Sequence, residues 1–414
     1  MRIAVIGSGI SGLASAWLLS QDHEVTLFEA ASYAGGHTHT HEVEQHGVRH
    51  SVDTGFIVFN REHYPLLAGL FNTLGVATQP TTMGFSVHRP DTGLEYNATN
   101  LDGLFCQRRN LVSPRFLGMV RDLLRFYREA PALLGGSRDN QELGDYLAEN
   151  GYGIAFRDDH LVPMASALWS SPARQILRFP VRYLVQFMAN HQMLRAGSRP
   201  QWEVVSGGSQ AYVRALRARW RVIERIGCGV VALRRRDDAV EVRHRHGIEH
   251  FDHAVLACHS DDALALLADA SGSERAVLGA IGFQSNEVVL HTDARLLPRS
   301  RKAWAAWNAY VPADPDNPCT VSYCMSLLQG IEAPEPYVVT LNRSVAIDPA
   351  KILRTLHYRH PEYTVASVAA QRRKSEIQGV QRTWFAGAYW GWGFHEDGMR
   401  SAVEVAQELG RLEA

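Results

Sequence analysis

The first thirty residues combine two apolar runs with an apolar stripe at helical spacing. Residues 2–6 form a short run rich in β-branched side chains, as in a buried strand. The stripe that follows consists of Ile10, Leu13, Ala14, Trp17 and Leu18. A second apolar run, residues 24–28, ends at Glu29. This pattern predicts a strand, a helix and a second strand.

Glycines occupy the turn between the first strand and the helix, in the sequence Gly7-Ser8-Gly9-Ile10-Ser11-Gly12. The first glycine allows a tight turn, the second lets a diphosphate approach the backbone, and the third lets the helix pack on the strand. Free N–H groups at the helix N-terminus favour an anion. Glu29 is placed to accept both hydroxyls of a ribose. We therefore predict a dinucleotide-binding unit, against the alternative of a glycine-rich turn without a ligand.

The rest of the chain separates a helical region from a sheet-rich one. Residues 111–134 and 161–194 are dense in Leu, Met, Phe and Trp at helical spacing, with arginines interleaved. Residues 266–375 alternate more like sheet. Near the C-terminus a strand passes Gly387, and a helix is predicted from about Met399 with Asp397 as its N-cap.

The apolar helical stretches have two interpretations. An amphipathic helix ordinarily packs its stripe into the core of its own domain. A helix that lies on a membrane surface or covers a lipid tunnel shows the same pattern, and arginines at its edge suit a carboxylate or phosphate headgroup. The sequence leaves both interpretations open, and with them a peripheral contact with a membrane.

Composition narrows the class of protein. The chain has 414 residues, enough for two domains, and 46% of them are hydrophobic. The net charge of −1 gives no electrostatic footprint for nucleic acid. Five cysteines without a CxxC pair favour reduced thiols in the cytoplasm. Met1 stands directly before the first predicted strand, so we expect no signal peptide, and no apolar run reaches the length of a membrane span.

Three further segments resemble the flavin amine oxidase and phytoene desaturase-like superfamily. Gly35-Gly36-His37 follows Glu29 at the spacing of its second fingerprint, residues 52–60 (VDTGFIVFN) resemble its third segment, and residues 382–410 resemble its C-terminal motif. The resemblance covers nearly the whole chain. It is closest to a bacterial group described as NAD/FAD-binding or amine oxidase-like proteins. It implies FAD as the cofactor.

The resemblance also implies an α/β fold, in which a Rossmann-like, glutathione-reductase-like FAD-binding domain carries an inserted α+β substrate domain. The FAD-binding domain is expected in three pieces, residues 1–62, 200–265 and 376–414. The substrate domain is expected in two insertions, a mainly helical one at 63–199 and a sheet-rich one at 266–375.

The resemblance further assigns residues to the cofactor. Residues 54–57 run beside the flavin ring, Val231 meets the adenine, and the helix N-terminus at Gly398 and Met399 points at the flavin pyrimidine. Two family arginines are replaced by Tyr33 and His37, which weakens charge contacts to phosphate and leaves the backbone cradle. The expected cofactor residues are Gly7, Gly9, Ile10, Ser11, Gly12, Glu29, Ala30, Gly35, Gly36, His37, Thr38, Thr54, Gly55, Phe56, Ile57, Val231, Gly387, Gly398 and Met399.

Three residues are candidates for catalysis. Asn286 stands where flavin amine oxidases carry a lysine linked to flavin N5 through water, and Lys302 nearby lies in a polar run that indicates a solvated side chain. Trp392 belongs to an aromatic run, Tyr389, Trp390, Trp392 and Phe394, which either packs in a core or contacts flavin or substrate. His395 is either an acid or base near neutral pH or a structural histidine.

Other cofactors and the route of the electrons are constrained less directly. His37, His39 and His41 alternate on an expected strand, but no carboxylate or cysteine nearby completes a usual ligand set, so we predict no metal. There is no second GxGxxG for NADPH. Electrons should therefore leave to oxygen, a quinone or a protein carrier, or return to the substrate.

These observations predict an FAD-dependent oxidoreductase. The expected substrate is an apolar, unsaturated fatty-acyl or lipid molecule, and the expected reaction is dehydrogenation or double-bond isomerisation. A flavin amine oxidase is the enzymatic alternative. A flavin-binding protein without turnover is the second alternative.

Overall fold

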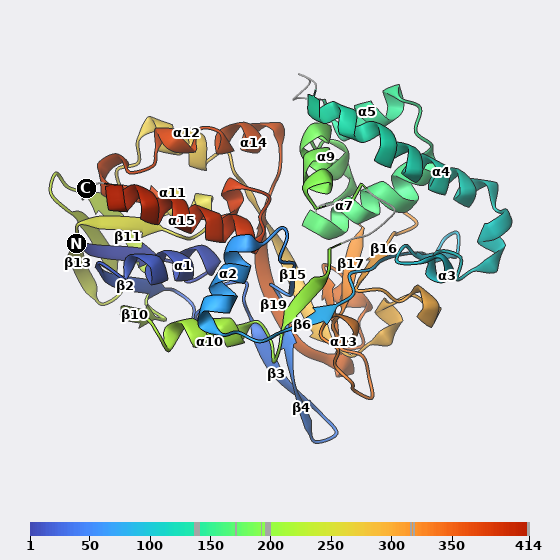
Figure 1. Ribbon diagram of the computed structural model, residues 1–414, viewed down its shortest axis with the longest axis horizontal. Coiled ribbons are helices and arrows are strands. Elements are labelled where there is room, and N and C mark those ends of the chain that lie inside the picture. Colours follow the sequence, from blue (N-terminus) through green and yellow to red (C-terminus); the bar gives the residue numbers. More distant parts are fainter. Residues whose placement is uncertain are drawn as a thin grey trace.

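A computed structural model describes residues 1–135, 141–169, 172–191, 193–194, 200–314, 317 and 319–411. Figure 1 shows two lobes, with both chain ends on the first lobe and the helices α4 (Pro114–Glu129), α5 (Leu143–Glu149), α7 (Val162–Trp169) and α9 (Val181–Asn190) on the second. The second lobe therefore lies away from the strand that opens the chain.

A five-stranded parallel sheet forms the centre of the first lobe. Its central strand is nearly continuous in apolar residues, because helices and a second sheet cover both of its faces. The strand order is β10 (Val222–Ile226), β2 (Glu24–Glu29), β1 (Arg2–Ile6), β14 (His253–Leu256) and β20 (Thr383–Phe385). These strands come from three distant parts of the chain. The exact domain boundaries stay a prediction.

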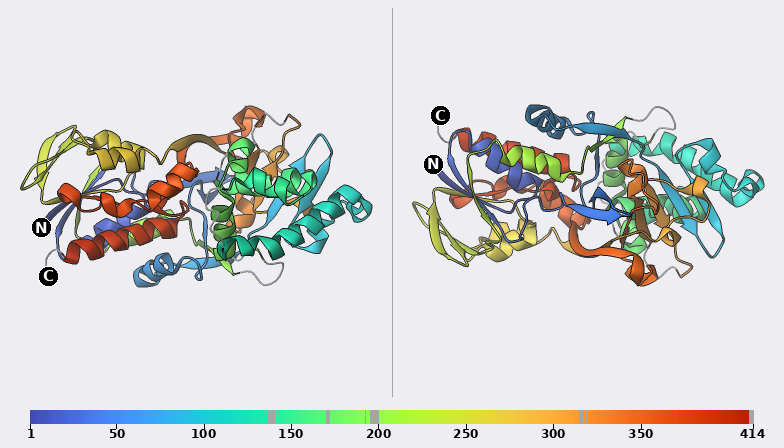
Figure 2. Two further views of the ribbon diagram at one scale, coloured as in Figure 1. Left: turned by 90° about the horizontal axis from the view of Figure 1, so that it is seen from above. Right: turned by 90° about the horizontal axis from the view of Figure 1, so that it is seen from below.

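Different elements cover the two faces of this sheet, as the two views of Figure 2 show. One face packs on α1 (Ile10–Leu19), α2 (Pro65–Leu74), α10 (Gln210–Arg217) and α15 (His395–Arg411). The other face packs on β11 (Val230–Arg235), β12 (Val240–His244), β13 (Gly247–Phe251), α11 (Ser260–Leu266) and α12 (Gly272–Leu278). The strand–turn–helix–strand unit predicted for the first thirty residues is confirmed.

A seven-stranded sheet underlies the second lobe. Its order is β19 (Ile352–Pro361), β15 (Phe283–His291), β18 (Val338–Leu341), β17 (Thr320–Cys324), β16 (Trp307–Tyr310), β7 (Phe85–Arg89) and β8 (Leu94–Asn97). Five strands come from the stretch expected to be sheet-rich. β7 and β8 come from the mainly helical stretch, and β7 pairs in parallel with β16. One sheet thus joins the two insertions.

Shorter elements complete the chain between the lobes and on their surfaces. A hairpin of β3 (Thr40–Gln45) and β4 (Val48–Asp53) projects at the bottom of Figure 1. A small sheet holds β5 (Val58–Phe59), β9 (Trp202–Val205) and β6 (Thr78–Thr81) in that order. The remaining helices are α3 (Leu101–Leu104), α6 (Ile154–Phe156), α8 (Ala173–Leu177), α13 (Met325–Leu328) and α14 (Val365–Gln371).

Prolines divide the second apolar helical stretch. Pro172 is the N-cap of α8 and Pro180 the N-cap of α9, so the stretch that looked continuous forms three short helices. A proline disfavours the helical conformation of the residue before it and lacks an N–H, so a helix usually ends before a proline. Residues 170–171, 192 and 195–199 lie outside the described part.

The C-terminal helix begins at His395, earlier than the start predicted at about Met399. Asp397 is therefore not its N-cap. Its carboxylate instead accepts the N–H groups of Trp392 at 2.9 Å and Phe394 at 3.1 Å, which lie before the helix. Gly398 is inside the helix, where a Cβ would lie 2.7 Å from the Cγ2 atom of Ile10, so the glycine allows α15 to pack tightly on α1.

Candidate cofactor and active site

The glycine turn after β1 leaves backbone exposed to a ligand. Gly7 has a φ of +102°, and a Cβ there would lie 2.6 Å from the Ala257 oxygen. A Cβ on Gly12 would overlap the Gly7 carbonyl. Gly9 is the N-cap of α1, no side chain caps it, and a Cβ on it would meet nothing within 4 Å. The first-turn N–H groups therefore lie open, which fits a diphosphate.

Glu29 is held at the end of β2 by the same turn. Its carboxylate accepts the N–H of Ser8 at 2.8 Å, the Ser8 hydroxyl at 2.6 Å and the N–H of Ala31 at 2.7 Å. A carboxylate has about four acceptor positions, so capacity remains for a ribose hydroxyl. The side chain is thus fixed in place beside the turn, as its predicted role requires.

A second pair of glycines lies against this turn. Gly35 and Gly36 have φ values of +136° and +57°, a conformation that favours glycine. A Cβ on Gly36 would lie 2.9 Å from the Gly9 Cα, and the Gly35 N–H donates to the Ser8 carbonyl at 3.0 Å. The two glycine segments, far apart in the sequence, therefore form one backbone cradle.

Residues 54–57 run beside the segment that follows Gly36. Thr54 and Phe56 donate their N–H groups to the carbonyls of His39 and His37, at 3.0 and 2.8 Å. A Cβ on Gly55 would overlap the His37 carbonyl, so this contact requires glycine. Ile57 is buried. The predicted ring-side segment is therefore adjacent to the cradle.

His395 opens α15 and touches both segments. Its ring stacks on Phe56 with centroids 3.7 Å apart, and its Nε2 lies 3.0 Å from the Thr38 hydroxyl. Thr38 is buried and also hydrogen-bonds Tyr212 at 2.6 Å. Burial lowers the pKa of His395 to about 3, so its imidazole stays neutral near pH 7. The structure favours a positioning contact, and a role in proton transfer stays a prediction.

The carboxylates near α15 are already bound to other groups. Glu396 accepts the N–H groups of Leu66 and Leu67, each at 3.0 Å, and so caps α2. Asp397 pairs with Arg400 in addition to its backbone contacts. Asp53 is buried, and burial raises its pKa to about 6. Its carboxylate accepts hydrogen bonds from Ser209, Thr40 and Gln329.

The aromatic run before α15 divides between two cores. Tyr389 and Trp390 pack near Phe283 and Ile281. Trp392 and Phe394 pack instead against the helical core of the second lobe, with Phe394 stacked on Phe187 at 5.3 Å. The Trp392 indole N–H is buried without a partner in the described structure. Trp392 thus lies where the two lobes meet.

Asn286 is fully buried in β15. Its amide N–H donates to the Nδ1 of His360 at 2.9 Å, and its oxygen accepts the Asn342 amide at 2.7 Å. The side chain therefore fixes the orientation of His360 on the neighbouring strand β19. Its place as the counterpart of the amine oxidase lysine stays a prediction.

All three lysines of the chain pair with acids elsewhere. Lys302 lies 3.1 Å from Asp102 on an exposed surface. Lys351 pairs with Glu335. Lys374 pairs with Glu404 of α15 and lies over the Trp390 ring, with its Nζ 5.7 Å from the ring centroid.

Two histidines that the sequence reasoning missed lie beside His37. The ring centroid of His37 is 6.2 Å from that of His259 and 5.4 Å from that of His360. His259 follows the carboxyl end of β14, next to the glycine turn, and ligands of parallel sheets bind at such ends, so this signal was available. His360 gave no local signal, because only strand pairing brings it here.

His39 and His41 belong to a separate hydrogen-bond chain. His39 Nδ1 lies 3.1 Å from the Tyr358 hydroxyl, which contacts the Thr54 hydroxyl at 2.8 Å, and His41 Nε2 lies 3.2 Å from Thr54. These rings are bound to hydroxyl groups. Among the described residues, a different group, His259, Asp261 and Asp262, has ligand atoms close enough for a metal, but Arg359 pairs with both carboxylates.

The remaining predicted cofactor residues lie at the edges of the cradle. Ala30 is exposed after β2, and a Cβ on Gly229 would lie 3.3 Å from its Cβ. Val231 is 59% exposed on β11, two residues beyond Gly229, a place open to an adenine. The Gly387 N–H donates to Ser401 at 2.9 Å, which ties β20 to α15. Ile10, Ser11 and Met399 are buried.

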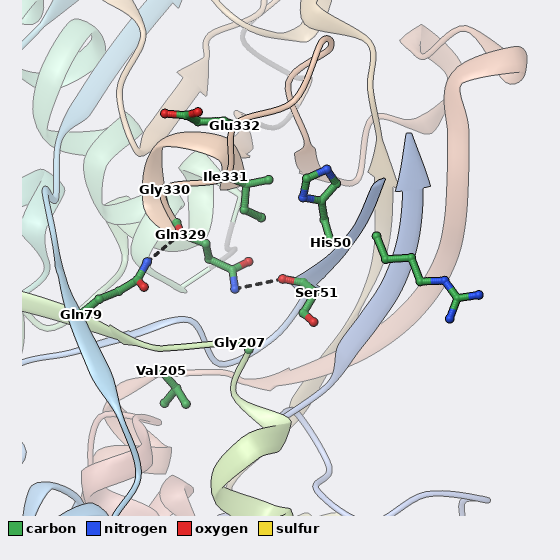
Figure 3. Close-up of a pocket in the computed structure, with 11 residues that line it drawn as sticks. His50, Ser51, Gln79, Val205, Gly207, Gln329, Gly330, Ile331 and Glu332 are labelled. Carbon is green, nitrogen blue, oxygen red and sulfur yellow. Dashed lines mark hydrogen bonds between the residues drawn. The ribbon is translucent and has the colours of Figure 1, made fainter. Parts of the chain in front are cut away.

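A cavity of about 270 Å³ lies apart from these residues, among β4, β6, the loop before α10 and the loop after α13. Figure 3 shows that its side-chain amides donate to backbone carbonyls: Gln79 to that of Gln329 at 2.8 Å, and Gln329 to that of Ser51 at 3.4 Å. None of the predicted site residues lines it. The cavity is therefore not the predicted substrate pocket.

In the described part of the chain, no helix is both long and apolar enough to cross a membrane.

Comparisons with known proteins agree with the fold. The family model of flavin containing amine oxidoreductases matches residues 10–302. A tryptophan 2-monooxygenase of Allorhizobium ampelinum is 55% identical over 42 residues, which are 10% of this chain and 6% of that enzyme. The chain thus spans only a small part of this curated relative.

Solved structures share the fold over nearly the whole chain. A CLA-producing fatty acid isomerase from P. acnes has a TM-score of 0.70 at 17% identity, covering 98% of both chains. Cyclohexylamine oxidase from Brevibacterium oxydans has a TM-score of 0.69 at 17% identity, covering 99% of both chains. Putrescine oxidase bound to putrescine has a TM-score of 0.69 at 13% identity, again with 99% of both chains covered. At these identities the likeness shows the fold alone.

Proposed function

The chain belongs to the flavin-containing amine oxidoreductase family, and we propose that it oxidises or isomerises an apolar, unsaturated fatty-acyl or lipid substrate. It is an FAD-dependent oxidoreductase of the amine oxidase family. FAD supplies the hydride acceptor. C–H bonds beside a double bond are weak enough to break by hydride loss without a dedicated base, so such a substrate suits a site with few titratable side chains.

The observation that carries the proposal is the chemistry of the side chains around α15. Glu396, Asp397 and Asp53 each have their carboxylates bound to backbone or side-chain donors, so none is free to anchor an ammonium group. No lysine of the chain lies at the start of α15. Trp392 and Phe394, just before α15, pack against buried aromatic rings of the second lobe.

These rings come from α7, α9 and Tyr363, two residues beyond the end of β19. Trp392 lies 6.2 Å from both Tyr183 and Phe187, and Tyr183 stacks on Tyr363 at 5.4 Å. An apolar wall of this kind binds hydrocarbon by excluding water, at about 0.8 kcal/mol for each buried CH₂. Among the solved structures of the same fold, the fatty acid isomerase provides a precedent for an acyl substrate.

The arginines at the edge of α4 do not strengthen a headgroup contact. Arg115 pairs with Asp159, Arg121 with Asp122, and Arg128 with Glu129. The proposal therefore rests on the aromatic wall, and a contact with membrane lipid is proposed only as a source of substrate. The electron acceptor is proposed to be oxygen, a quinone or a protein carrier, or the substrate itself in an isomerase.

The test is a titration of the FAD-loaded protein with cis-unsaturated fatty acids of increasing chain length. We expect a shift of the visible flavin bands, with affinity rising about fourfold for each added CH₂ until the wall is filled. Saturated acids of equal length are the matched control: they should bind and leave the flavin oxidised. Affinity that does not change with chain length would contradict the proposal.

Two competing functions predict different results in the same experiment. The first alternative is a flavin amine oxidase, and cyclohexylamine and putrescine oxidases are among the structural neighbours of this chain. In that case an amine should bleach the flavin rapidly. If the protein binds flavin without turnover, no added compound should bleach the flavin, and the double bonds of the added compounds should stay unchanged. Mass spectrometry of small molecules released from denatured protein would identify the bound class directly.

A further inference from the structure

Three histidine rings from separate elements meet beside the glycine cradle. His37 follows Gly36, His259 stands between β14 and α11, and His360 is near the end of β19. Burial and the neighbouring imidazoles lower the pKa of His37 well below its usual value, and burial lowers that of His360 to about 4. Both rings are therefore neutral near pH 7 in the protein alone.

The cluster adjoins the place where a diphosphate fits. Gly36, directly before His37, approaches the Gly9 Cα so closely that a Cβ would lie only 2.9 Å away. A Cβ on Gly7 would lie 2.6 Å from the oxygen of Ala257, which stands two residues before His259. The two segments that enclose the glycine turn thus each end in a histidine of the cluster.

Permanent positive charge is scarce around this cluster. Arg359 lies over the Phe283 ring on which His259 stacks, and its two terminal nitrogens pair with Asp261 and Asp262. Glu29 adds a negative charge on the other side of the turn. Of the described residues, the titratable and charged groups that face the cluster are Glu29, Tyr33, His39, Cys258, Asp261, Asp262, Tyr358, Arg359 and His395.

The two negative charges of a diphosphate would therefore meet only the partial charge of the α1 N-terminus, about half an elementary charge. An opposite charge at close range stabilises the protonated form of histidine. A neutral imidazole beside the cradle can supply the missing countercharge by taking up a proton.

The hydrogen bonds distinguish the three rings. His360 accepts the Asn286 amide at Nδ1, and Asn342 fixes the amide orientation, so this ring is held in its neutral form with its proton on Nε2. His259 stacks on Phe283 with centroids 4.2 Å apart, and its Nδ1 faces Asp262 at 3.4 Å. The His37 ring makes no hydrogen bond to any of the described residues, so the ring is free to gain a proton.

We propose that His37 takes up a proton when FAD binds and pairs, as an imidazolium, with the cofactor diphosphate. The pKa of His37 then rises on binding. A group whose pKa is higher in the bound state adds affinity that is fully present below the free-state pKa and is lost as the pH rises through the bound-state pKa. FAD affinity should therefore fall as the pH rises above the lowered free-state pKa of His37 and level off above its bound-state pKa.

The experiment measures the dissociation constant of FAD from the full-length protein by equilibrium dialysis, without substrate, from pH 5.5 to 8.5. For one proton taken up, the dissociation constant should rise up to about tenfold per pH unit. The dependence of the FAD dissociation constant on pH is measured without substrate. This test can therefore fail or succeed separately from the test of the proposed function, which measures fatty-acid binding.

Two substitutions of the same residue make the test specific. His37→Arg carries a permanent charge, so its dissociation constant should be flat across the pH range and, at pH 8, no weaker than that of the wild type. His37→Asn should also be flat but weak, with the wild-type advantage lost at pH 6. Circular dichroism melting of each variant checks that the fold is kept, and FAD binding by His37→Arg is itself evidence of a folded site.

His41→Gln is the matched control, because this histidine lies on the same segment but is bonded to Thr54. It should keep the wild-type slope. The inference is overturned if the wild type shows no slope, if His37→Arg keeps the wild-type slope, or if His41→Gln loses it.

Discussion

The two lobes of this protein differ in which atoms form the site: mainly backbone in the first lobe and mainly side chains in the second. In the first lobe the cradle is backbone: a glycine turn, a helix N-terminus without a side-chain cap, and the paired segments 35–39 and 54–57. In the second lobe the wall is made of packed side chains from α7, α9 and the end of β19. Backbone can approach a ligand only where side chains are absent, whereas a side-chain wall can change shape without changing the fold. The comparison teaches that the cradle depends on backbone conformations that glycine favours, whereas the wall depends on how large side chains pack.

The largest effect is expected in the wall. Phe187→Ala removes a ring that touches Trp169, Phe394 and Trp392, and should destabilise the protein by about 3–5 kcal/mol, because the space left behind cannot collapse fully. Chemical denaturation measures the loss. The comparison further predicts that the folded variant still carries its full share of FAD at low temperature.

Leu124→Ala in α4 is the control, since this side chain is 51% exposed and should change stability by no more than about 0.5 kcal/mol. Loss of FAD from folded Phe187→Ala protein would show that the two lobes do not act separately.

A smaller change in the cradle should lower FAD binding, which the change in the wall should leave intact. Gly12→Ala adds one carbon that overlaps the Gly7 carbonyl, which forces the turn apart at a cost of about 3 kcal/mol. We expect the protein to lose bound flavin, measured as the ratio of visible to ultraviolet absorbance. Gly118→Ala in α4, where a Cβ meets nothing within 4 Å, should keep it. A yellow Gly12→Ala protein would argue against the backbone cradle.

Glu29→Ala tests the one acidic side chain on which the cradle depends. Its loss removes a charge-assisted acceptor worth about 1.5–3 kcal/mol, so FAD should bind about 10–150-fold more weakly. Because Glu29 also accepts two hydrogen bonds from Ser8, Glu29→Gln separates the two roles: the amide keeps one acceptor oxygen and should lose less affinity. Equal losses in both variants would place the whole effect in the charge.

The smallest expected effect is no effect at all. Primary, secondary and polyamines should give no hydrogen peroxide above background with the FAD-loaded protein, because the acids near α15 are bound to other groups. A peroxide-coupled assay over a range of pH measures this. Peroxide from any one amine would reverse the ranking of the proposed substrates and move the substrate anchor out of the aromatic wall.

Local pattern was enough to predict the cofactor-binding unit. The strand from Arg2, the glycine turn and the helix from Ile10 form as expected, because each depends on neighbours a few residues away. The start of α15 was predicted four residues too late, because Asp397 bonds N–H groups that precede the helix, a contact that sequence spacing does not distinguish from an N-cap. The single apolar stretch at 161–194 became three helices for a local reason that was visible in the sequence, the prolines at 172 and 180.

The sequence by itself determined the family, the cofactor and the order of the first elements, since glycine conformation, apolar periodicity and the acid at the end of β2 act over short distances. Only the tertiary structure decided what surrounds them. In it, His259 and His360 lie beside His37, Asn286 hydrogen-bonds to His360, and the Glu396 carboxylate accepts N–H groups at the N-terminus of α2. These residues lie between tens and hundreds of positions apart in the chain. Their contacts depend on how strands pair and lobes pack, and short-range physics does not encode that pairing in any one segment.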